Sequence, residues 1–215
     1  MNENLKKAII LYSAGNKGEL ENFLTGLSKK SLESLFIDLM TVYFNDKNSS
    51  KLRELSAIYI AGYEPNKEKL GYNGYRQLID TQKAVYCEVK PQNTDNSKKK
   101  LNGGGSFNDY TPERFMKHSE ENPKVLTCGF AHGKLLYIFE FDFKCLENRL
   151  KTLIDKYFPQ GERKRGYYLR SASFSIREYK DCENLNAVFI RKDIDKFRTF
   201  LSKELFEVIK KLTGR

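Results

Sequence analysis

The stretch Ala84-Val85-Tyr86-Cys87-Glu88-Val89-Lys90-Pro91 decides the fold expected for this chain. Its β-branched and aromatic residues predict a strand over 84–90, and Pro91 predicts the end of that strand. Side chains alternate between the two faces of a strand, so Glu88 and Lys90 share one face and the apolar side chains occupy the other. The strand therefore carries a carboxylate and an ammonium close together, and a polar, Gly-rich segment follows it.

The chain before this strand reads as mostly helical. Apolar residues recur at helical spacing, most clearly over 31–44, and Gly62 predicts the end of the last helix. The helices are expected over residues 3–14, 19–27, 31–44 and 50–61. The sequence thus predicts a helical N-terminal region over 1–62.

The remaining residues, 63–215, alternate between strand and helix patterns. A short strand over 75–79 and a turn over 80–83 lead into the opening stretch, and a polar loop over 92–106 follows it. Further strands are expected over 125–130, 135–143, 167–176 and 187–191, and helices over 111–120, 144–158 and 193–212. This order predicts an α/β (α+β) fold, with a mixed five- to six-stranded sheet flanked by helices, in what is expected to be one compact domain.

Composition narrows the class of protein. No apolar run approaches the ~20 residues that a membrane span needs, and the N-terminus does not resemble a signal peptide, so we expect a cytoplasmic protein without membrane contact. The four cysteines are widely spaced and are expected to be free thiols: Cys87, Cys128, Cys145 and Cys182. A histidine-based nuclease or a Ser-His-Asp hydrolase would have to use His118 or His132, and neither lies in a recognisable motif.

Charge points to a polyanionic partner. The formal net charge is +10 and the pI is about 9.3, which favours nucleic acid or an anionic membrane surface. Basic residues concentrate over 161–180, where Tyr167, Tyr168 and Phe174 lie among them. Basic side chains interleaved with aromatic ones suit a groove that holds phosphates and bases, so nucleic acid is the favoured partner.

Glu88 and Lys90 together suit metal-assisted hydrolysis of a phosphodiester. A carboxylate oxygen is a ligand that Mg²⁺ prefers, and the metal activates water and stabilises charge on the phosphate oxygens. A lysine two residues further along the same face can position the attacking water and offset the negative charge of the phosphate. We therefore take Glu88 and Lys90 as the candidate catalytic pair.

The segment Val-Tyr-Cys-Glu-Val-Lys-Pro over 85–91 lies between a short strand with its turn and a polar loop with a helix, and in this setting it resembles the PD-(D/E)XK nuclease superfamily. The small size and basic charge are similar to those of a type II restriction endonuclease. This resemblance implies a restriction-endonuclease-like core and Mg²⁺-dependent cleavage of double-stranded DNA. It further implies a homodimer that acts at a short, partly palindromic site, with Glu88 as a metal ligand.

The family motif also requires an acidic residue on the preceding strand, for which Asp80 is the nearest candidate. A turn over 80–83 places Glu88 opposite Tyr75, and Asp80 then lies roughly 17 Å from Glu88 along the strand. Asn73, opposite Lys90 in this register, is an alternative oxygen ligand. Three further acids remain candidates: Glu54, Glu64 and Glu68.

The side chains expected to contact DNA are basic or amide groups in loops, on strands and at a helix start: Lys98, Lys99, Lys100, Asn108, Arg114, Arg163, Lys164, Arg165 and Arg170. Arginine commonly binds guanine, so Arg170 is the candidate for base contact. The glycines over 103–105 permit close approach of the backbone to a phosphate, but no Gly-Lys-Ser/Thr follows, which disfavours a P-loop.

Two other functions fit the same sequence. The protein could be a sequence-specific nucleic-acid-binding protein without catalysis, which the poor position of Asp80 favours. A weaker alternative is an RNA-processing nuclease on a similar fold.

Overall fold

The computed structural model describes residues 3–45, 50–66, 71–78, 83–159 and 166–214. The N-terminal helices are α1 (Glu3–Ser13), α2 (Lys17–Thr25), α3 (Lys29–Asn45) and α4 (Lys51–Ile60). The later helices are α5 (Pro112–Glu121), η1 (Phe143–Leu146), α6 (Glu147–Tyr157), η3 (Ile176–Glu178), η4 (Ile194–Phe200) and α7 (Lys203–Thr213). The strands are β1 (Glu64–Pro65), β2 (Gly74–Gln77), β3 (Ala84–Thr94), β4 (Gly105–Tyr110), β5 (Lys124–Ala131), β6 (Lys134–Asp142), β7 (Leu169–Phe174) and β8 (Asn186–Ile190).

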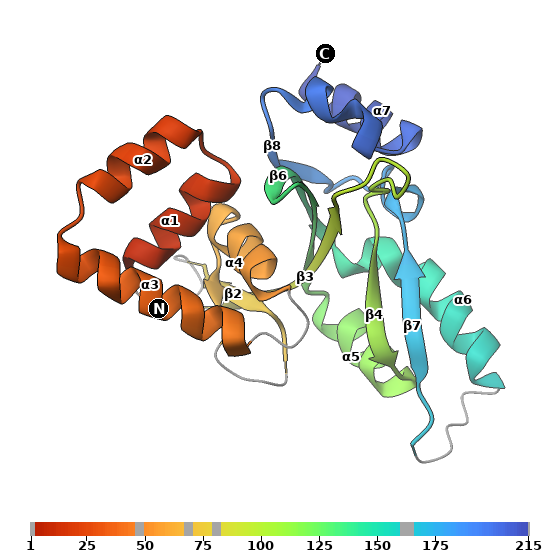
Figure 1. The fold of residues 1–215 in the computed structure, drawn as a ribbon. Helices are drawn as coiled ribbons and strands as arrows, with labels where there is room; N and C mark the ends of the chain where they lie inside the picture. Colours follow the sequence, from red (N-terminus) through yellow and green to blue (C-terminus); the bar gives the residue numbers. More distant parts are fainter. Residues whose placement is uncertain (1–2, 46–49, 67–70, 79–82, 160–165, 215) are drawn as a thin grey trace.

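A six-stranded sheet in the order β1-β2-β3-β5-β6-β8 forms the centre of the molecule. β3 and β5 run parallel, with α5 in the connection between them, and the other neighbours are antiparallel. The sheet is thus mixed, and the predicted α/β class is confirmed. Figure 1 shows α1–α4 grouped on one side of β3 and the β4–β7 ribbon, α5 and α6 on the other.

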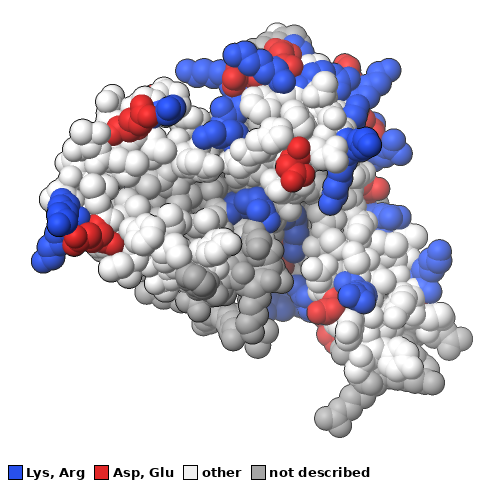
Figure 2. Space-filling view, in the orientation of Figure 1, with Lys and Arg blue, Asp and Glu red and all other residues white. Residues whose placement is uncertain are grey.

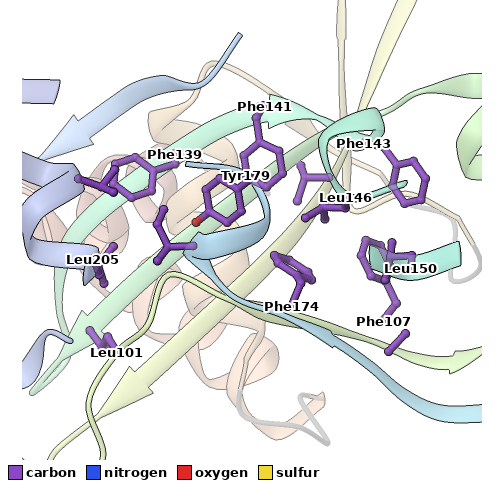
Figure 3. Close-up of a cluster of buried hydrophobic side chains, with 14 of the residues drawn as sticks. Leu101, Phe107, Phe139, Phe141, Phe143, Leu146, Leu150, Phe174, Tyr179 and Leu205 are labelled. Atoms are coloured by element: carbon purple, nitrogen blue, oxygen red, sulfur yellow. The ribbon is translucent and has the colours of Figure 1, made fainter. Parts of the chain in front are cut away.

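Apolar side chains from the two faces of the sheet enter two separate cores. On one face, Cys87, Val89 and Leu126 pack with residues of α1 and α4. On the other face, Val125 and Phe141 pack with residues of the β4–β7 ribbon, α5, α6 and α7. Figure 3 shows the second core, in which the rings of Phe141 and Tyr179 stack with their centroids 3.9 Å apart. Burial on both faces makes this a layered structure with the sheet in the middle.

β3 is longer than predicted, because it passes through Pro91 and ends at Thr94. Its antiparallel pairing with β2 covers only Ala84 to Cys87, whereas its parallel pairing with β5 continues to Thr94. The N–H of Val89 points toward the β2 side, where it bonds to Asn73 Oδ1. Alternate residues point their N–H groups to the same side, so the N–H that Pro91 lacks would lie where β2 has already ended. Proline therefore costs the sheet no ladder hydrogen bond.

The predicted strand over 167–176 exists as β7, but it lies outside the main sheet. It pairs antiparallel with β4, which forms from the end of the predicted 92–106 loop, and the two make a separate ribbon. Phe107, Ala172 and Phe174 face the core, and Asn108 and Ser171 face outward.

The predicted closing helix over 193–212 is interrupted. η4 ends at Phe200, and Leu201 then extends to form a bridge with Leu101, whose N–H bonds to Phe200 O at 2.8 Å. Ser202 next caps α7, its Oγ accepting the N–H of Leu205 at 3.2 Å. The helical periodicity continues across the interruption because both pieces bury apolar residues in the same core.

The expectation of four free thiols is wrong for two of them. Cys145 and Cys182 form a disulfide between η1 and the segment that follows η3, whereas Cys87 and Cys128 are free and buried. Spacing of 37 residues gave no sign of this pair, which only the fold brings together. Across the described ranges, each helix is too short or too polar to cross a bilayer.

Candidate functional site

Glu88 lies in the middle of β3, on the face of the sheet that the β4–β7 ribbon covers. It is paired with Val125 of β5 and is 5% exposed. Lys90 occupies the next position on the same face, as the alternation of the strand requires. The structure thus confirms that the two candidate catalytic side chains share one face and that Cys87 and Val89 occupy the other.

Two cations flank the buried carboxylate. Glu88 Oε1 lies 3.8 Å from Lys90 Nζ and 3.6 Å from an Nη atom of Arg114. Lys90 Nζ also lies 4.3 Å from the ring centroid of Phe107, which covers the lysine on the ribbon side. A buried carboxylate is costly unless ion pairs and hydrogen bonds compensate its lost hydration. Here two cations surround one carboxylate, so the group carries a surplus positive charge that favours an anion.

The start of α5 positions Arg114. Thr111 caps the helix, its Oγ1 accepting the N–H of Arg114, and Pro112 occupies the first turn. The Arg114 side chain then reaches back, where one Nη donates to the backbone carbonyl of Asn108 at 2.8 Å. With 42% of its side chain exposed, Arg114 links Glu88 to the solvent.

A shell of aromatic residues and a histidine surrounds these charges. Tyr110 OH and His118 Nδ1 share a hydrogen bond of 3.0 Å, and the rings of Tyr72 and His118 lie 5.6 Å apart. Burial lowers the pKa of His118 to about 3, with smaller effects from the nearby Arg114, Lys90 and Lys117. His118 is therefore a neutral imidazole at neutral pH.

Sequence reasoning missed this shell, because Tyr72, Tyr110 and His118 come from separate segments with no shared spacing. The one usable signal was the Thr111-Pro112 helix start, which fixes where Arg114 enters the site.

The predicted register of the β2–β3 hairpin is wrong by two residues. Gly74 pairs with Cys87, so Glu88 is adjacent to Asn73 rather than opposite Tyr75. Because strand side chains repeat every two residues, this shift leaves each side chain on its expected face. Asn73 Oδ1 accepts the N–H of Val89 at 2.8 Å, so the candidate amide ligand lies at the site and already holds the β3 backbone.

No described residue is assigned as the acid that the family motif requires before Glu88. Asp80 and Glu68 lie outside the described residues. Glu54 accepts a hydrogen bond from Ser50 and lies near Cys128, in the core on the opposite face of the sheet. Glu64 pairs with Lys6 at the β1 edge of the sheet. Among the described residues, no three His, Cys, Asp or Glu side chains are grouped closely enough to hold a metal ion together.

The predicted DNA-contacting residues are divided between separate regions. Arg114 and Asn108 lie at the site, and Arg170 is exposed on β7, next to Leu169, which pairs with Tyr110. The exposed lysines over 98–100 follow the end of β3 at Thr94, and that end lies roughly 20 Å from Glu88 along the strand. Arg163, Lys164 and Arg165 lie outside the described residues.

The three glycines over 103–105, at the start of β4, serve packing within the protein. A Cβ on Gly105 would lie 2.5 Å from Lys90 Cβ, and a Cβ on Gly104 would lie 2.0 Å from Phe174 O. Gly103 has φ +70. These contacts explain the glycines through close approach of protein to protein, and they let β4 lie against the lysine of the candidate pair.

The molecule is hollowed between the N-terminal helices and the β4–β7 ribbon. Figure 2 shows Lys and Arg side chains inside this hollow, and β3 runs between the two walls in Figure 1. A duplex or single strand of nucleic acid placed there would meet a positive surface.

The oxygen ligands at this site satisfy only part of what Mg²⁺ requires. Mg²⁺ commonly binds through one or two carboxylates and keeps several waters and substrate phosphates. Glu88 on β3 and the amide of Asn73, the residue before β2, provide two oxygen donors. To bind a metal, Glu88 would exchange its contacts with Lys90 and Arg114 for contacts with the ion, which frees both cations for a phosphate.

Comparison with known proteins finds no family model that matches the chain and no curated protein whose sequence matches it.

Proposed function

We propose that this protein is a metal-dependent endonuclease of the PD-(D/E)XK type, which hydrolyses phosphodiester bonds of double-stranded DNA. The observation that carries the proposal is the buried Glu88 carboxylate on β3, with Lys90 Nζ at 3.8 Å and Arg114 at 3.6 Å. The net charge of +10 and the basic hollow beside β3 support a polyanionic substrate.

Each side chain has a defined part in this proposal. Glu88 and Asn73 would hold Mg²⁺, which lowers the pKa of a bound water and stabilises charge on the phosphate. Lys90 orients the attacking water and offsets charge on the scissile phosphate. Arg114, which is more exposed, binds the phosphate and returns to Glu88 when the substrate leaves.

The wider assignment rests on the same resemblance. We propose a cytoplasmic type II restriction enzyme that acts as a homodimer on a short site, because two copies would present two such sites to the two strands of a duplex. The exposed Arg170 and Asn108 on the ribbon are the proposed contacts to DNA beyond the scissile phosphate.

The decisive experiment is cleavage of phage DNA by the purified protein with and without Mg²⁺. Discrete fragments are expected with the wild type, and Glu88→Gln or Lys90→Ala should lower the rate by about 100-fold or more while DNA binding is retained. Glu140→Gln is the matched control. Glu140 is also a buried carboxylate, 7% exposed, but it bonds to Tyr63 and Arg76 on the other face of the sheet. If Lys90→Ala cuts DNA at the wild-type rate, Lys90 takes no part in catalysis.

A second candidate is a nucleic-acid-binding protein without catalysis. The absence of a three-acid group among the described residues favours it, as does the pairing of Glu88 with two cations. This protein would bind DNA with a Kd that rises by about 10³-fold or more between 50 and 200 mM salt, if it neutralises six or more phosphates. It would leave DNA intact with Mg²⁺ or Mn²⁺, which separates it from the nuclease.

A further inference from the structure

The N-terminal helices enclose a cavity of about 500 Å³ on the face of the sheet away from Glu88. Its walls come from α1, α2, α3 and α4, and Asn93 of β3 and Phe130 of β5 also line it. Leu5, Ile9 and Phe130 belong to the core that contains Cys87 and Val89, which places the cavity behind the sheet relative to the candidate nuclease site. Its volume lies within the ~300–1,000 Å³ range of small-molecule sites.

The wall of this cavity is almost entirely apolar. Besides the core residues, four leucines from α2 and α3 line it: Leu20, Leu24, Leu35 and Leu39. Ser13 and Ser56 also line it, but each hydroxyl donates to a carbonyl of its own helix at 2.8 Å, Ser13 to Ile9 and Ser56 to Leu52. Both serines thus present little unused polarity to a ligand.

Among the described residues that line the cavity, Arg53 is the charged one. Its Nε is buried and has no hydrogen-bond partner within the described part of the chain. Protein atoms cover Nε, so the two Nη atoms are the donors left for a ligand. They form no hydrogen bond or ion pair with the described residues, and together they offer a planar fork that fits a carboxylate. The cavity therefore combines an apolar volume with one unused anion-binding group.

We propose that this cavity binds a medium-chain fatty acid, with its carboxylate on Arg53 and its alkyl chain among the leucines. The carboxylate would accept charge-assisted hydrogen bonds from the Nη atoms of Arg53. The chain would gain affinity from each methylene removed from water. The site is independent of the proposed nuclease function, because its residues belong to other elements and to the opposite face of β3.

The test is isothermal titration calorimetry with octanoate, decanoate and dodecanoate below their micelle concentrations, and with decan-1-ol. Affinity should rise about fourfold for each methylene until the cavity is filled. Decanoate should bind about tenfold or more tightly than decan-1-ol, because only decanoate forms the charged bond with Arg53.

Variants assign the binding to this cavity. Arg53→Leu should remove the preference for decanoate over decan-1-ol and retain the binding of the alcohol. Ala8→Phe places a ring in the cavity and should weaken both ligands, with folding checked by circular dichroism. Lys151→Leu is the matched control, since it removes one positive charge from an exposed site on α6 and should change neither affinity.

Two results would overturn the proposal. One is the same affinity for decanoate in the wild type and in Arg53→Leu. The other is equal weakening by Lys151→Leu, which would show that decanoate binds the basic surface rather than the cavity.

Discussion

Glu88 is buried at 5% exposure, yet it lies in a polar setting built from three directions. Lys90 approaches along its own strand, Arg114 from the start of α5, and Asn73 holds the neighbouring backbone from the residue before β2. Removal of either cation would leave the carboxylate less compensated, and removal of the carboxylate would leave two cations facing each other. The charge of Glu88 therefore matters to stability as well as to the proposed chemistry.

His118 makes stability sensitive to acid. Its folded pKa is lowered to about 3 from the ordinary value of 6.5 by burial and by the cations around it. Below pH 6.5 the unfolded chain takes up a proton that the folded protein does not, so stability falls as pH decreases from about 6.5 toward 3. Urea unfolding should show that the stability of the wild type relative to His118→Phe decreases by about 1.5 kcal/mol between pH 6.5 and pH 5.

This comparison cancels the titration of the other acids, which both proteins contain. His118→Phe also removes the partner of Tyr110 OH, but that loss is the same at both pH values. A constant difference between the two proteins would mean that His118 has the same pKa in the folded and unfolded states.

At the level of elements, the N-terminal cap of α5 both stabilises the helix and positions the residue that contacts Glu88. Thr111 Oγ1 accepts the N–H of Arg114, the residue that reaches Glu88. Thr111→Ala should lower the free energy of unfolding by about 1 kcal/mol, because an N–H of the first turn loses its acceptor. Chemical denaturation would measure this change.

Thr25→Ala provides the control for that experiment. Thr25 is exposed and its hydroxyl donates to Glu21 O within α2, so it caps no helix start. Loss of this hydroxyl should change the free energy of unfolding by less than about 0.5 kcal/mol. Equal effects of the two substitutions would contradict a capping role for Thr111.

For the whole molecule, the Cys145–Cys182 disulfide closes a segment that contains α6, β7 and η3. A bridge over this length restricts the unfolded chain, so reduction should lower stability by about 2–4 kcal/mol. Guanidinium unfolding with and without dithiothreitol would measure the difference. In a reducing cytoplasm the same pair would be thiols, and stability would be correspondingly lower.

The double variant Cys145→Ser/Cys182→Ser should not respond to dithiothreitol. Alkylation of the unfolded, unreduced wild type should modify two cysteines, Cys87 and Cys128. Modification of all four would show that the bridge does not form.

Much of the fold follows from local patterns. Helical periodicity gave α1–α4, the Thr111-Pro112 start gave α5, and the two apolar runs around His132-Gly133 gave the β5–β6 hairpin. The alternation of β3 placed Glu88 and Lys90 on one face. These features depend on residues close in sequence, so the sequence alone predicts them.

What the sequence by itself determined, then, was the α/β class and the pairing of Glu88 with Lys90 on a strand. Only the tertiary structure decided the β2–β3 register, the separation of β7 into a ribbon, the disulfide, the approach of Arg114 to Glu88 and the position of His118 near Arg114 and Lys90. Each of these depends on contacts between residues far apart in the chain. Such contacts are selected by packing and by the compensation of buried charge, which no local pattern encodes.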